Sequence, residues 1–70
     1  MRYANVIEQA DGNFSAYVPD LPGCVATGTT IEEVEEQIKE AILFHLDGMR
    51  EDGVSPPAAQ SQVEYVEVAA

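Results

Sequence analysis

The chain has 70 residues, which is enough for one small domain, and carries 13 acidic side chains against three lysine and arginine residues. The formal net charge of −10 disfavours direct nucleic-acid binding, because phosphate contacts need clustered cations. One cysteine excludes an intrachain disulfide, and no stretch approaches the ~18 apolar residues of a membrane span.

We therefore expect residues 1–70 to form a single cytoplasmic domain that is neither exported nor anchored. A hydrophobic fraction of 46% is sufficient for collapse despite the charge. The acidic surface predicts a basic partner, and the plain alternative is that the carboxylates only keep a small protein soluble.

Strand-forming residues dominate the first part of the chain. Residues 3–9 and 14–18 flank the turn cluster at 11–13 and together predict a β-hairpin. The Pro-Asp-Leu-Pro-Gly run at 19–23 predicts a shaped loop, because proline fixes φ and glycine permits positive φ. Residues 24–27 then fit a short third strand.

A long amphipathic helix is predicted next. Thr30 and Glu33 form a capping-box pattern at its start, and Gly53 is the expected residue just beyond its end. At about 100° per residue, the apolar positions fall on one broad stripe that should face the core. These positions are Ile31, Val34, Ile38, Ala41, Ile42, His45, Leu46 and Met49.

Residues 54–59 form a proline-stiffened connection, and 63–68 predict a closing strand. The order β-β-β-α-β indicates an α+β fold, a three-to-four-stranded and mostly antiparallel sheet with one long helix on one face. A right-handed crossover would place the last strand parallel to the first, if it joins that strand. Because the strands carry apolar groups on both faces, we expect a second chain to cover the other face or an edge, in a homo-oligomer (dimer or tetramer) or with another protein.

Residues 14–33 carry a more specific pattern. An aromatic strand leads into Pro-Asp-Leu-Pro-Gly-Cys at 19–24, followed by a short strand, Gly28, a hydroxyl cap and a helix with early acidic residues. This order resembles the signature of the HicB-like antitoxin family, and the resemblance covers nearly the whole chain.

The resemblance implies a truncated ribonuclease-H-like fold without that fold's catalytic carboxylates. It also implies a function, which is to bind and neutralise a small basic HicA-type toxin that cleaves mRNA. Longer members continue into a DNA-binding segment, and this sequence ends at Ala70 soon after the fourth strand, so operator binding is not expected.

Two places are candidates for partner contact. In the loop, Leu21 would present a rigid apolar knob beside a carboxylate, or alternatively cap the core. On the helix, Leu43 and Phe44 project away from the main stripe toward the acidic side, or alternatively pack within the same chain. The predicted partner-binding residues are Asp20, Leu21, Pro22, Gly23, Glu36, Glu40, Leu43 and Phe44.

No catalytic, metal or cofactor site is predicted. A magnesium site would need the carboxylate of Asp20 to gather with others that have no diagnostic spacing, namely Glu8, Asp11, Glu33 and Asp52. His45 on the apolar stripe favours a structural role, and Cys24 favours a buried thiol. Two alternatives to the antitoxin stay open, a stand-alone oligomeric scaffold or small-ligand binder, and a residual metal-dependent nuclease.

Overall fold

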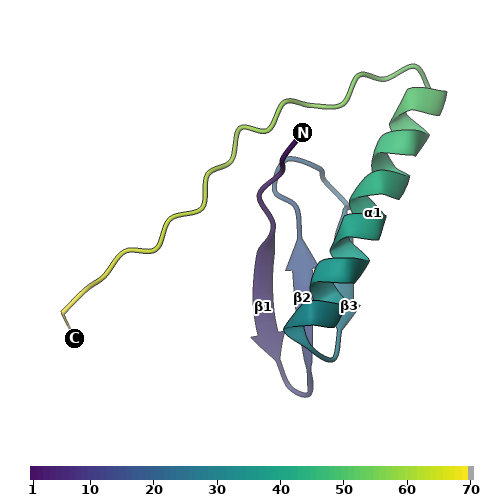
Figure 1. The fold of residues 1–70 in the computed structure, drawn as a ribbon. Helices are drawn as coiled ribbons and strands as arrows, with labels where there is room; N and C mark the ends of the chain where they lie inside the picture. Colours follow the sequence, from purple (N-terminus) through teal and green to yellow (C-terminus); the bar gives the residue numbers. More distant parts are fainter. Residues whose placement is uncertain (70) are drawn as a thin grey trace.

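The computed structural model describes residues 1–69. Three strands precede one long helix: β1 (Val6–Ala10), β2 (Asn13–Tyr17), β3 (Val25–Gly28) and α1 (Ile31–Glu51). The helix lies on one face of the sheet (Figure 1), so the predicted α+β architecture is confirmed. Within the described chain, no helix combines the length and the apolar character that a membrane span requires.

The sheet is antiparallel with the order β1-β2-β3, so β1 and β3 are both edge strands. Gly12 has a φ of 76° in the tight turn between β1 and β2, a conformation that favours glycine. The register aligns Ile7 with Ala16, and Ala16 with Ala26. All three side chains of this row pack into the core, which identifies the face of the sheet that the helix covers.

Both ends of α1 are fixed by local hydrogen bonds. The Glu33 amide donates to Oγ1 of Thr30 at 3.0 Å, and the Glu33 carboxylate accepts from the Thr29 amide at 3.2 Å. At the other end, Gly53 has a φ of 72° and the Val54 amide donates to the Met49 carbonyl at 2.8 Å. The predicted helix start and stop are confirmed.

The core is small and lies between α1 and the strands β2 and β3. The helix and the sheet come close together at Gly28, where an added Cβ would lie 2.7 Å from the backbone nitrogen of the fully buried Val34. Glycine is therefore required sterically at this position. The buried residues are Ala16, Val18, Leu21, Cys24, Val34, Ile38 and Leu46.

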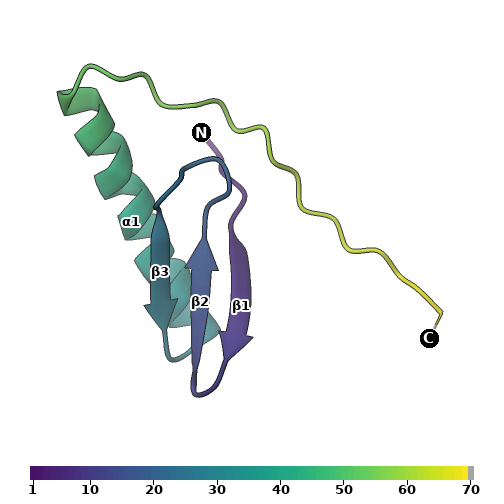
Figure 2. The ribbon, with the colours of Figure 1, turned by 180° about the vertical axis from the view of Figure 1, so that it is seen from behind.

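The predicted closing strand is wrong for the chain described here. After α1, residues 54–69 run back past the end of the sheet and away from it as an extended segment without strand pairing (Figure 2). A strand needs a neighbour for its backbone hydrogen bonds, and 63–68 have none in this chain. The face of the sheet opposite α1 is also open: the row Val6, Tyr17 and Val25 crosses it, with Tyr17 42% and Val25 65% exposed.

Two glycine substitutions should separate close packing from helix propensity. Gly28→Ala should lower the free energy of unfolding by about 1–3 kcal/mol, because its methyl group meets the backbone of Val34. Gly48→Ala, inside the helix with open space around it, should raise it by about 0.5–1 kcal/mol. Urea unfolding at one fixed protein concentration measures both, and equal effects of the two changes would contradict the close helix–sheet contact.

Candidate functional site

The loop at 19–23 is closed on itself, and its leucine points inward. The Leu21 amide donates to the Val18 carbonyl at 3.1 Å, and the Cys24 amide donates to the Leu21 carbonyl at 3.0 Å. Leu21 is only 1% exposed, so the expectation of an exposed knob is wrong and Leu21 caps the core instead. Pro22 and Gly23 remain exposed at the tip of the loop.

Asp20 holds the C-terminal segment against this loop. Its Oδ2 accepts hydrogen bonds from the amides of Gln60 and Ser61, both at 2.9 Å, and its Oδ1 accepts from the Ser61 hydroxyl at 2.9 Å. The Ser61 amide bond is the main reason that the pKa of Asp20 lies below its ordinary value, with desolvation opposing it. Asp20 therefore serves first as an anchor within the chain.

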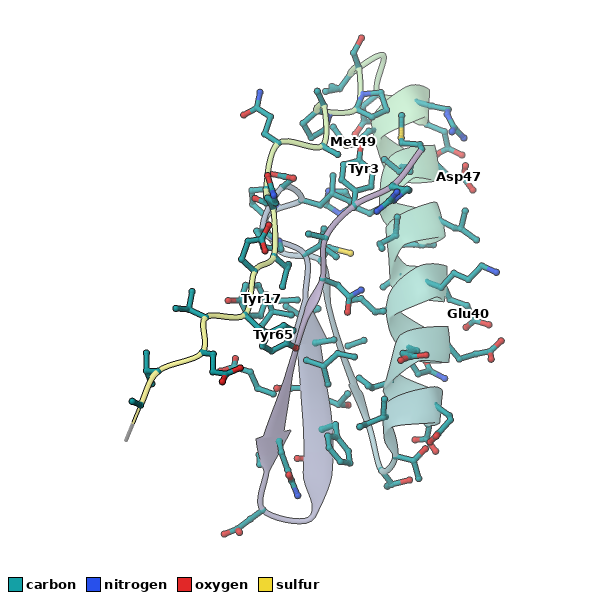
Figure 3. All side chains as sticks on the ribbon, turned by 60° about the vertical axis from the view of Figure 1, so that its left-hand side comes forward. Tyr3, Tyr17, Glu40, Asp47, Met49 and Tyr65 are labelled. Atoms are coloured by element: carbon teal, nitrogen blue, oxygen red, sulfur yellow. The ribbon has the colours of Figure 1, made fainter. Side chains whose placement is uncertain are left out.

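A second contact fixes the same segment nearer the helix. The Tyr3 hydroxyl donates to the Pro57 carbonyl at 2.6 Å, and Tyr3 precedes β1 (Figure 3). Residues 57–61 are thus attached at two points to the end of the sheet. Neither contact is predictable from the sequence, since nothing local links residue 3 or residue 20 with a partner about forty or more positions away.

The outer side of α1 carries the other predicted residues. Glu36 and Glu40 are exposed, and Figure 3 shows Glu40 pointing away from the sheet. Phe44 is 83% exposed and Leu43 is 55% exposed, so the alternative that they pack inside the chain is not what the structure shows. We call Glu36, Glu40 and Phe44 the outer helix face.

The two predicted places remain separate in the described chain. The loop follows β2 at the end of the sheet, whereas the outer helix face comes from the middle of α1. No hydrogen bond or ion pair within residues 1–69 joins them, and the one ion pair found there links Asp47 to Arg50 at 2.9 Å. An anionic helix side with an exposed aromatic ring can bind a cationic protein surface through charge and apolar contact together.

His45 and Cys24 differ in burial. His45 is half-buried on the helix, and Cys24 is 3% exposed within the core. Burial raises the pKa of the Cys24 thiol, which keeps it in the unreactive protonated form. Within the described residues, no three His, Cys, Asp or Glu side chains gather into a group that could hold a metal ion.

A three-stranded antiparallel sheet under one long helix, with exposed carboxylates and an exposed aromatic ring on the helix, defines a small α+β domain. Residues 3–69 match the model of a family described as HicB-like antitoxin of bacterial toxin-antitoxin system. The chain belongs to the HicB-like antitoxin family, which confirms the resemblance drawn from residues 14–33.

The chain is also similar in sequence to individual known proteins. The chain is 38% identical over 66 residues to a 14.9 kDa protein from the rep-hol intergenic region of Haemophilus phage HP1, covering 94% of this chain and 50% of the phage protein. It is 41% identical over 56 residues to a UPF0150 protein of Archaeoglobus fulgidus, covering 76% of this chain and 81% of that protein. The chain thus spans about half the length of the phage relative and most of the archaeal one.

A solved structure shares the fold. It is titled a HicA3 and HicB3 toxin-antitoxin complex, and it superimposes with a TM-score of 0.72 at 25% sequence identity. The match covers 86% of this chain and 70% of the other.

Replacing the anchoring carboxylate should free the C-terminal segment. Asp20→Ala removes all three acceptor contacts, so hydrogen exchange at the Gln60 and Ser61 amides should accelerate at least several-fold over wild type at the same pH. Glu36→Gln changes the charge equally on the exposed helix and should leave those amides unchanged. Unaltered exchange in Asp20→Ala would show that the contact does not hold the segment.

The contact of Asp20 with Gln60 and Ser61 should weaken when the pH is lowered and not when it is raised. A carboxyl group whose pKa is lowered by folding stabilises the folded form above its unfolded pKa of about 3.9, and the stabilisation is lost as pH falls through the lower folded value. Protection of Gln60 and Ser61, taken as a ratio to Asp20→Ala at each pH, should therefore persist at neutral pH and above. It should disappear only in strong acid, and a loss near neutral pH would contradict the assignment.

Proposed function

We propose that this protein is an antitoxin that binds a small basic mRNA-cleaving toxin of the HicA type and neutralises it by protein contact. The observation that carries the proposal is the outer helix face, where Glu36, Glu40 and the exposed ring of Phe44 follow one another at successive turns of α1. It occurs in a chain that belongs to the HicB-like antitoxin family. The solved complex of a structural neighbour, named for a toxin and an antitoxin, supports a partner of that class.

Charge provides the physical reason for inhibition. A toxin that cleaves RNA needs a cationic surface to hold phosphates, and carboxylates from a domain of net charge −10 can occupy those positions. Opposite charges also speed the encounter of the two proteins, an effect that salt screens over about 8–10 Å at physiological ionic strength. The exposed aromatic ring adds apolar contact that salt does not weaken, so binding should persist at reduced affinity when salt rises.

The loop contributes mainly through its support of the fold. Leu21 is buried and Asp20 is engaged by the C-terminal segment, so within the loop only the tip at Pro22 and Gly23 is free to touch a partner directly. We propose this tip and Leu43 as secondary contacts beside the outer helix face. The protein acts in this proposal as a cytoplasmic binding protein without catalytic activity, and without direct contact to nucleic acid.

A second candidate function is a stand-alone oligomeric scaffold of the same fold with no toxin. The observation that favours it is the open sheet face, where the Val6, Tyr17 and Val25 row has no cover from α1. Both candidates allow self-association, so the presence of a toxin complex separates them.

The proposal is tested by co-expression with a small basic HicA-type protein encoded beside the gene. The two proteins should co-purify and restore growth that the toxin alone arrests. Glu40→Lys on the outer helix face should weaken the complex about tenfold, mostly through slower association, and Phe44→Ala should weaken it by a similar factor through faster dissociation.

Glu8→Lys is the matched control, because Glu8 is an exposed carboxylate on β1 rather than on α1. It makes the same change in net charge and should weaken the complex far less than Glu40→Lys. If Glu8→Lys and Glu40→Lys lowered the affinity for the toxin equally, binding would depend on the net charge of the domain and not on a defined contact at the outer helix face. Failure to co-purify with such a neighbour would overturn the antitoxin proposal and leave the scaffold.

A further inference from the structure

A groove of about 690 Å³ lies between the outer edge of the sheet and the helix. Tyr3, Asn5 and Ile7 line it from the side of β1, and Ile42 and Leu46 are among the residues that line it from α1. β1 is paired only with β2, so its other edge presents free backbone N–H and C=O groups. An apolar groove beside a free strand edge is the environment that an added strand fills.

One polar atom in this groove lacks a partner. The side-chain oxygen Oδ1 of Asn5 is buried and accepts no hydrogen bond from the described residues. Buried acceptors are almost always satisfied in native proteins, because the unpaired group loses its contact with water. A strand placed along β1 would bring backbone N–H donors to this position.

The same chain carries a strand-forming segment with no place to pack. Residues 63–68 read Val-Glu-Tyr-Val-Glu-Val, a composition typical of strands. Tyr65 is 97% exposed, Val66 81% and Val68 73%, although such side chains are normally buried. The segment projects from the body of the molecule in both ribbon views (Figures 1 and 2).

The chain that leads into this segment is held in place. Asp20 and Tyr3 fix residues 57–61, and Pro56 and Pro57 stiffen the connection from the helix. The segment is therefore presented outward, past its own β1. An element that is held away from its own domain can be exchanged with the identical element of a second copy, which is a low-cost route to a dimer.

The charges that line the groove beside β1 favour an occupant that carries carboxylates. Lys39 and Arg50 line the groove, and they are two of the only three lysine and arginine residues in the chain. Glu35 also lines it, and Arg50 is shared with Asp47 outside the groove. In a protein of net charge −10, this is the surface best able to accept a segment whose own charges are glutamates.

We propose that residues 63–68 of one copy insert as a fourth strand beside β1 of a second copy, and that the exchange is reciprocal. The result is a two-fold dimer in which each groove holds the partner's C-terminal strand. This dimer does not depend on the presence of a toxin, so it is tested with the purified protein alone.

The first test changes Tyr65 and Val66, which are 97% and 81% exposed in the single chain and can therefore be altered without loss of the fold. Wild type should sediment at twice the chain mass of 7.6 kDa. The double variant Tyr65→Ser, Val66→Asp should raise the dimer dissociation constant at least tenfold, with an unchanged circular dichroism spectrum.

The groove is tested from the other side. Leu43→Asp places a charge in the groove at a position already 55% exposed, so the fold should survive and the dimer should weaken at least tenfold. Phe44→Asp is the matched control, because the neighbouring side chain lies outside the groove lining. It should leave the dimer intact.

Mixing the two variants distinguishes strand exchange from other arrangements of the dimer. The segment variant retains an intact groove and Leu43→Asp retains an intact segment, so a mixture should form a heterodimer with one of the two exchanged strands in place. Sedimentation of the mixture with one variant fluorescently labelled should show this species at concentrations where each variant alone is monomeric.

Three results would each overturn the proposal. One is a wild type that is monomeric at micromolar concentration, since the segment would then be free or paired with its own β1. Another is a dimer that survives the segment changes, which would point to the open sheet face. The last is a mixture of the two variants that shows no heterodimer.

Discussion

One helix has to cover a sheet that is wider than it is. A helix with its side chains is about 10 Å across, and neighbouring strands lie about 4.8 Å apart, so a single helix shields about two strands. Here α1 lies over β2 and β3 and comes close to the backbone of β3 at Gly28. Strand β1 is therefore not covered by the helix, and it keeps a free edge and a groove on its helix side. The opposite face of the sheet is also exposed.

The position of the helix was predictable because the decisive signals are local. The capping residues Thr30 and Glu33 and the glycine after the helix act within a few residues of one another, and the structure has them as the sequence indicates. The apolar stripe packs against the core from Val34 to Met49, but its predicted first member is wrong, because Ile31 in the first turn is 46% exposed. The hairpin follows from a turn cluster between two short strand-forming runs. The signals that place these elements in the sequence are therefore local, although their stability comes from packing against one another.

The conformations of the loop and the C-terminal segment were harder to predict from the sequence, because they depend on contacts between residues far apart in the chain. Leu21 lies between two prolines, and that pattern fits an exposed tip or a buried cap equally well until the core volume is known. The contact of Asp20 with Ser61 spans 41 positions, so it depends on the completed fold rather than on either local sequence. The strand signal at 63–68 is present in the residues, but a strand forms only beside a neighbour, and the single chain offers none to this segment in its extended course.

The arrangement of charge allows two kinds of association on one small domain. The outer helix face is anionic and turns away from the sheet, while the groove beside β1 holds Lys39 and Arg50. A second copy repels the first at long range, because both carry −10. In the groove beside β1, apolar burial and the pairing of the few cations with glutamates both act against this repulsion. A basic protein meets the reverse situation, since the outer helix face attracts it from a distance. Self-association beside β1 would thus leave Phe44 and its neighbouring carboxylates free, so each copy in a dimer could hold its own cationic partner.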